Sequence, residues 1–345
     1  MPYCNLLCMH CSIHEVHLRD HARTKGSVML KLSIITLFLG QTKNRFLVYQ
    51  DAADTPTHLD RAGAAEGIGA VELRCPADTS DIAATKEALK RNNLAVSAIN
   101  FASVRNDRWL RGAWTAEDPA ERQAAVDDAK RAIDLAAELG APRFHTCPLN
   151  EGFDYPFELD PIAALDYSAE CFEQICAHNR DMKICIEYKI NEPRVRCQIG
   201  NAGELIAFAN IVGADNLGAT LDAGHCFLAG ENPAAAAALL HKCNRLFYVH
   251  INDNDTRGDW DLTPGTWHTW EFIELFYTLE RLGYDDWIAF DIVCKEHESP
   301  QVFTDAAAIA NKLKEISLRI DKDDMAARYK SRNPTSTMRM LNDLL

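Results

Sequence analysis

From Met29 onward, short apolar runs alternate with longer amphipathic stretches along the chain. Short apolar runs rich in β-branched residues, bounded by polar or turn residues, predict β-strands. Eight such runs occur, at residues 29–38, 68–74, 94–100, 141–147, 182–189, 216–222, 244–250 and 287–293.

The stretches between these runs have the period of helices. In the clearest of them, residues 120–140, apolar residues recur at spacings of three and four, and the pattern stops at Gly140. Further helices are predicted to begin near Thr57, Asp81, Asp160, Ala202, Asn232, Thr269 and Phe303. Eight strand–helix units predict an α/β fold that closes into a (β/α)8 TIM barrel. An open doubly wound sheet is the alternative, but the G-x-G-x-x-G motif expected after an early strand of such a sheet is missing.

We expect three segments along the chain. Residues 29–321 form the catalytic barrel. Residues 1–28 precede the first strand and are expected to be a disordered extension or the product of a mis-set start site. Residues 322–345 are polar and then amphipathic, which predicts a C-terminal helical tail.

Charge and composition narrow the class of protein. A net charge of -14 opposes binding to nucleic acid, since that affinity depends on Lys and Arg neutralising phosphates. No apolar run reaches the roughly 18 to 20 residues that span a bilayer, so no membrane association is expected. The 12 cysteines are scattered, which favours reduced thiols in a cytoplasmic protein.

Ionisable residues gather where the predicted strands of the second half end. Glu187 ends the fifth strand, Asp222 the sixth, His250 the seventh and Asp291 the eighth, and His225 follows Asp222 by three residues. Chemistry in α/β barrels takes place at this end of the strands. Close together and unpaired, such groups would repel one another and resist burial, and a divalent cation removes both problems. An oxygen-rich set with one nitrogen favours Mn²⁺, with Co²⁺, Mg²⁺ or Zn²⁺ as alternatives.

The segments IEYK, TLDAGH, FYVHINDN and WIAFDI resemble the xylose-isomerase-like TIM-barrel superfamily of sugar isomerases and epimerases. The resemblance implies that Glu187, Asp222, His250 and Asp291 bind one divalent metal ion and that His225 binds substrate. It also implies proton transfer through an enediolate, with Glu187 and Asp291 as acid and base. Asp291 departs from the ketose epimerases, which usually carry Glu at this position.

Loop residues near these strand ends are further candidates for substrate binding. Lys189 and Arg194 follow Glu187 in the segment EYKINEPR, and Asn252 and Asp253 follow His250. Trp260 lies in the loop after the seventh strand, where an aromatic ring could stack on a sugar.

Two other activities stay open. His145, in the segment FHTCPL, together with EYKINEPR resembles the metal-dependent subunits of C-glycoside deglycosidases. In that case the protein is a lyase that eliminates the aglycone from 3-keto C-glycosides with His145 as base, in a hetero-oligomer with a small second subunit. Otherwise a homo-oligomer acting on a small sugar is expected. An endonuclease IV-like activity is the remote alternative, because strands two and three end in Arg74 and Asn100 rather than in histidines.

Overall fold

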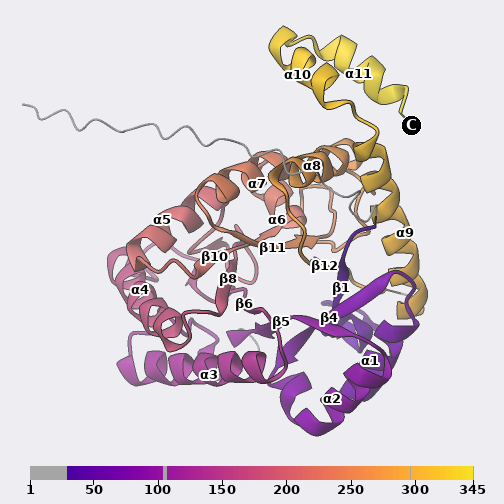
Figure 1. Cartoon of the computed structure of the whole chain (residues 1–345). Coiled ribbons are helices and arrows are strands. Elements are labelled where there is room, and N and C mark those ends of the chain that lie inside the picture. The colour runs from indigo at the N-terminus through magenta and orange to yellow at the C-terminus, as the bar shows by residue number, and fades with distance from the viewer. Residues whose placement is uncertain (1–28, 104–106, 296, 345) are drawn as a thin grey trace, which may run out of the picture.

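The computed structural model describes residues 29–103, 107–295 and 297–344. Eight parallel strands close into a barrel, and Figure 1 shows them at the centre of a ring of helices. In chain order the strands are β1 (Leu32–Ile35), β4 (Ile68–Cys75), β5 (Ala95–Phe101), β6 (Arg143–Thr146), β8 (Lys183–Glu187), β10 (Leu217–Asp222), β11 (Leu246–Ile251) and β12 (Ile288–Phe290). Each strand pairs with its neighbours in this sequence, and β12 closes onto β1. The predicted TIM barrel is therefore confirmed.

Helices cover the outside of the barrel between successive strands. They are α1 (Thr55–Ala64), α2 (Ile82–Arg91), α3 (Pro119–Glu138), α4 (Pro161–His178), α5 (Ala202–Val212), α7 (Pro233–Lys242), α8 (Thr269–Leu282) and α9 (Ser299–Leu318). Three of them begin with the same sequence signal. Asp118, Asp160 and Asn232 each accept a hydrogen bond from the first turn, and a proline follows each of them. These Asp-Pro and Asn-Pro pairs explain why the helix starts could be read from the sequence.

Several local elements differ from the predictions. The first strand is shorter than residues 29–38, because a 3-10 helix, η1 (Thr36–Leu39), follows β1 directly. A short helix, α6 (Ala223–Leu228), begins immediately after β10. Two small antiparallel pairings were not expected, the hairpin of β2 (Thr42–Lys43) with β3 (Val48–Tyr49) and the long-range pair of β7 (Gly152–Phe153) with β9 (Arg196–Cys197). β12 ends at Phe290, so Asp291 lies one residue beyond the strand.

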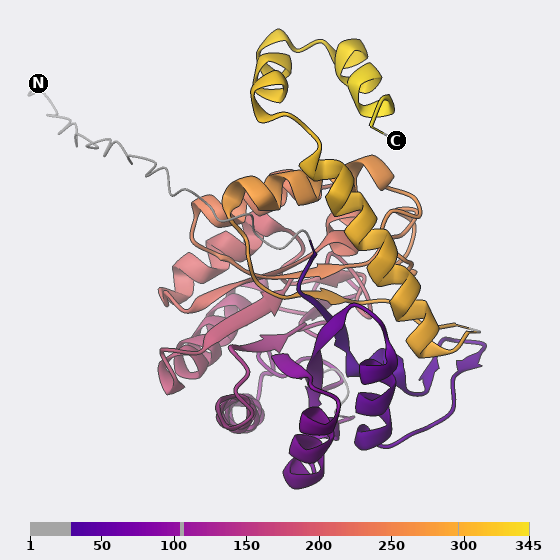
Figure 2. The same cartoon turned by 45° about the vertical axis from the view of Figure 1, so that its right-hand side comes forward.

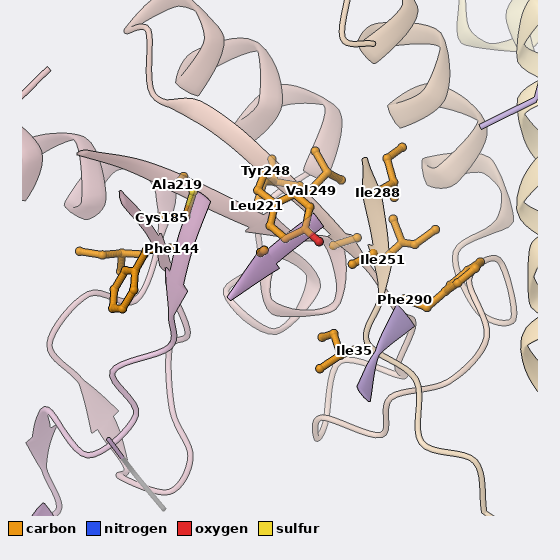
Figure 3. Packing of buried hydrophobic residues seen from close by; sticks show 14 of the residues in the cluster. Ile35, Phe144, Cys185, Ala219, Leu221, Tyr248, Val249, Ile251, Ile288 and Phe290 are labelled. Carbon is orange, nitrogen blue, oxygen red and sulfur yellow. The ribbon is translucent and has the colours of Figure 1, made fainter. Parts of the chain in front are cut away.

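The register of the strands separates the core from the barrel interior. Leu221 pairs with Val249, and Val249 with Ile288, so these side chains share one face and pack in the buried hydrophobic core that Figure 3 shows. Asp222 and His250 are also partners in this register, one position along, and therefore share the opposite face. The alternation that builds the core thus also directs the polar strand ends inward.

Two helices follow the barrel, α10 (Lys322–Ser331) and α11 (Pro334–Asn342). Figures 1 and 2 show them beyond the end of α9, outside the ring of helices. The expected extension at residues 1–28 lies outside the described part of the chain. Within the described ranges, no helix has the length and apolar character that crossing a membrane would require.

Candidate metal centre and substrate cavity

Four side chains from successive strand ends converge at the carboxyl end of the barrel. Glu187, Asp222, His250 and Asp291 each offer a ligand atom, and these atoms all lie within 4.8 Å of one another. The first three side chains are buried, and Asp291 is partly exposed. The structure therefore brings together all four residues that the sequence indicated as metal ligands.

The charges in this cluster do not balance. Burial and then repulsion from Glu187 and Asp222 raise the pKa of Asp291 well above its ordinary range. Burial also raises the pKa of Asp222, whereas His250, His145 and His225 hold the pKa of Glu187 well below its usual value in spite of burial. Three carboxylates thus share too few cationic partners, and the unbalanced negative charge is seen most clearly in the raised pKa of Asp291. A hard divalent cation would supply the missing charge, and the donor set of three carboxylates and one imidazole fits such an ion.

A cavity of about 600 Å³ opens above this cluster. Glu187 and Asp291 line it, with Lys189 and His225 beside them. Apolar side chains of η1, Leu37 and Phe38, contribute other parts of the wall. Pockets of this size, with apolar surface and a few convergent polar groups, are typical of small-molecule sites.

Lys189 and His225 meet at one carboxylate in the cavity wall. The Nζ atom of Lys189 donates to Oδ2 of Asp259 and to Oε2 of Glu192, both at 2.6 Å. The Nε2 atom of His225 lies 3.4 Å from Oδ2 of Asp259, and its Nδ1 atom lies 3.0 Å from the carbonyl oxygen of Tyr188.

Neighbouring carboxylates favour the protonated form of both groups. Burial alone would lower the pKa of His225, but Asp222 and Asp259 raise it to about 10. Burial would likewise lower the pKa of Lys189, and Asp259 and Glu192 raise it instead. Two positive hydrogen-bond donors therefore face a cavity whose floor is acidic.

Four other residues expected at the substrate do not line this cavity. Arg194 forms an ion pair with Asp154 at 2.9 Å. The Asn252 amide donates to Oδ2 of Asp222 at 2.8 Å and so helps to hold this candidate metal ligand in place. Asp253 accepts from the backbone nitrogens of Trp267 and His268 and from the His268 ring, and thereby anchors the loop. Trp260 is half exposed, and its Nε1 atom donates to Asp255.

His145 also lies away from the cavity surface. Its side chain is fully buried, with Nε2 3.1 Å from Oε2 of Glu187 and Nδ1 3.3 Å from Oε1 of Glu72. His145 therefore sits beneath the carboxylate cluster, and it is not among the described residues that line the cavity.

Sequence reasoning missed Glu72, Asp259 and Asp261. Glu72 lies within β4 rather than at the end of the strand, but its inward side chain reaches His250. Asp259 and Asp261 line the cavity from the loop after β11, a loop in which the sequence drew attention to tryptophan. The signal that could have found them is the density of aspartates in the segment NDNDTRGDWD.

Known proteins share this architecture. Xylose isomerase of Thermus thermophilus is 27% identical over 212 residues, a match that covers 60% of this chain and 55% of that protein. The match thus spans about half the length of that relative.

Two solved structures resemble the fold at low sequence identity. The L-ribulose 3-epimerase structure has a TM-score of 0.66 and 19% identity, covering 86% of this chain and 98% of that one. The 3-keto-D-glucoside 4-epimerase of E. coli has a TM-score of 0.63 and 16% identity, covering 81% of this chain and 98% of that one. At such identities the likeness concerns the fold alone. The sequence model of the family described as "Xylose isomerase-like TIM barrel" matches residues 60–313, more than half of the sequence. The chain therefore belongs to that family.

Proposed function

We propose that this protein is a sugar isomerase or epimerase that depends on one divalent metal ion, Mn²⁺ being the best fit. The observation that carries the proposal is the convergence of Glu187, Asp222, His250 and Asp291 beneath a cavity whose wall includes Glu187, Asp291, Lys189 and His225. Its family and its structural relatives include enzymes that act on sugars.

Each group of the cavity has a part in this proposal. A bound dication would act as a Lewis acid toward a sugar carbonyl and its neighbouring hydroxyl. Glu187 and Asp291 come from different strands and both line the cavity, so they are placed to take a proton from a carbon beside the carbonyl and to return it. Lys189 has a third N–H beyond those given to Asp259 and Glu192 and can donate it to a substrate oxygen, whereas Nε2 of His225 would exchange its contact with Asp259 for one with the substrate.

The position of His145 favours isomerisation or epimerisation over elimination. A base that removes a substrate proton must come within hydrogen-bond reach of it. His145 is fully buried between Glu72 and Glu187, whereas Glu187 and Asp291 face the cavity directly. Isomerisation or epimerisation therefore fits the described residues better than the lyase reaction does.

Hydrogen exchange with solvent tests the proposal. The metal-stripped protein is supplied with Mn²⁺ in D2O and offered free ketoses, free aldoses and a 3-keto glucoside, the last because one structural relative is named for such a substrate. We expect deuterium at the carbon beside the carbonyl of at least one sugar, and no exchange in EDTA or with Glu187→Gln.

Two results would contradict the proposal. Exchange that continues in EDTA would refute the metal dependence. Reaction with only a 3-keto glycoside, accompanied by release of the aglycone, would replace the isomerase with the lyase. The matched control is Asp286→Asn, which alters an ion pair with Arg143 at the start of β6 and is not among the residues that line the cavity, and it should leave exchange unchanged.

A further inference from the structure

Glu72 reaches across the barrel interior to a candidate metal ligand. It is fully buried in β4, and its Oε2 atom lies 3.0 Å from Nε2 of His250 on β11. Strands β1 and β12 separate β4 from β11 in the barrel, so this contact does not follow from strand pairing. The Asn100 amide donates to Oε1 of Glu72 at 2.6 Å and fixes the other end of the carboxylate.

The two nitrogens of His250 face different surroundings. Nδ1 lies 3.3 Å from Oε1 of Glu187 and 3.9 Å from Oδ2 of Asp291, whereas Nε2 faces Glu72. A carboxylate can only accept a hydrogen bond, so Nε2 donates to Glu72. Nδ1 lies beside the carboxylates that would hold a metal ion, and an ion bound there would take the place of a proton on Nδ1 while Nε2 keeps its hydrogen bond to Glu72.

A second metal ion at Glu72 is the rival explanation. Ligand atoms of Glu72, His145 and His250 also lie within 4.8 Å of one another. Such an ion would have to take Nε2 of His250 while the first ion took Nδ1, which requires an imidazole without any proton. The hydrogen bond from Nε2 to Glu72 needs only an ordinary neutral ring, and the amide of Asn100 already occupies part of the carboxylate.

We infer that Glu72 is a positioning residue that fixes the tautomer and orientation of His250, so that Nδ1 is the metal ligand. The inference rests on the proposed function, since it concerns the same metal ion. His145 lies between the two carboxylates, with its nitrogens 3.3 Å from Glu72 and 3.1 Å from Glu187. Carboxylates behind metal-binding histidines raise the basicity of the ligand, and their loss typically weakens metal binding about 10- to 100-fold.

Metal affinity of Glu72→Gln is the first test. Glutamine keeps the size and an acceptor oxygen but removes the charge, so we expect the Kd for Mn²⁺ to rise about 10- to 100-fold. Glu72→Leu, which removes the acceptor, should weaken binding further. Asp286→Asn should leave the Kd unchanged, and thermal unfolding of the metal-free proteins identifies any variant that fails to fold.

Nitrogen-15 NMR of the histidine rings gives a readout that a merely structural role would not move. In the wild-type protein loaded with diamagnetic Zn²⁺, we expect one ion per chain, a retained proton on Nε2 of His250 and no proton on Nδ1. Two ions per chain, an Nε2 without a proton, or an unchanged Mn²⁺ affinity in Glu72→Gln would each overturn the inference. Wild-type protein that binds no divalent ion would instead refute the proposed function, so the two failures are distinguishable.

Discussion

Buried carboxylates occur in two contrasting surroundings in this protein. Asp78, between β4 and α2, accepts hydrogen bonds from the hydroxyls of Thr36 and Thr55 and from the backbone and guanidinium of Arg74. The cluster of Glu187, Asp222 and Asp291 beneath the cavity instead gathers three carboxylates around a few histidine rings. Asp78 is surrounded by donors, and Asp222 accepts from Asn252 and from the backbone of His225, whereas the contact of Asp291 with Nδ1 of His250 is a long one, at 3.9 Å.

The pKa directions separate the two surroundings. Burial alone would raise the pKa of Asp78, yet the contacts with His58 and Arg74 hold it well below its ordinary range. Burial and the neighbouring carboxylates both raise the pKa of Asp291. Donors supplied by the fold thus identify a structural carboxylate, and like charges without enough donors indicate that a ligand must supply positive charge.

Asp222→Asn should have the largest effect in the cavity. The substitution removes one negative ligand, so we expect the Kd for Mn²⁺ to rise more than about 100-fold. This exceeds the loss of affinity that is usual when a residue that only hydrogen-bonds to a ligand is changed. Sugar exchange should fall to background. Isothermal titration of the metal-stripped protein measures the affinity, and deuterium incorporation measures the activity.

Asp78→Asn is the control variant for this comparison. It should leave Mn²⁺ affinity unchanged but lower the free energy of unfolding by about 3 kcal/mol, because removing one charge of a buried pair leaves the other uncompensated. Denaturant unfolding of the two metal-free variants measures this difference. An Asp222→Asn protein that loses more stability than Asp78→Asn would show that the cavity cluster is structural after all.

The stabilisation by Asp78 should depend on pH with a definite sign. Its pKa in the folded protein is depressed, so its contribution is present above the unfolded value of about 3.9 and is lost as pH falls toward the folded value. The difference in unfolding free energy between wild type and Asp78→Asn should therefore be full at neutral pH and shrink below about pH 4. A difference that grows as pH falls would contradict the assignment.

The barrel and the four candidate metal ligands could be predicted because both follow from strand periodicity. Apolar runs indicated the strands, and residues at the ends of parallel strands all lie at the carboxyl-end rim of the barrel. Asp222 and His250 required only this rule and the register that pairs them.

Glu72 and Asp259 required information that the sequence pattern lacks. Glu72 reaches His250 across the barrel interior, and strand ends give no sign of such a contact. Asp259 meets Lys189 only when the loop after β11 folds back over β8, a contact 70 residues apart in the sequence. Arg194 shows the converse, since its place after Glu187 suggested substrate while its guanidinium pairs with Asp154 in the loop.

Asp291→Asn should have the smallest effect on stability and the opposite sign from Asp78→Asn. A carboxyl group whose pKa is raised in the folded state costs stability at neutral pH, because it must take up a proton or keep a charge that its neighbours repel. The neutral amide removes that cost, so the metal-free variant should be as stable as the wild type or slightly more so, in denaturant unfolding with EDTA present. With Mn²⁺ present the order should reverse, since a bound ion stabilises the protein that holds it more tightly. A metal-free variant less stable than wild type by more than about 1 kcal/mol, the size of an ordinary lost hydrogen bond, would mean that Asp291 has donors of its own and belongs with Asp78.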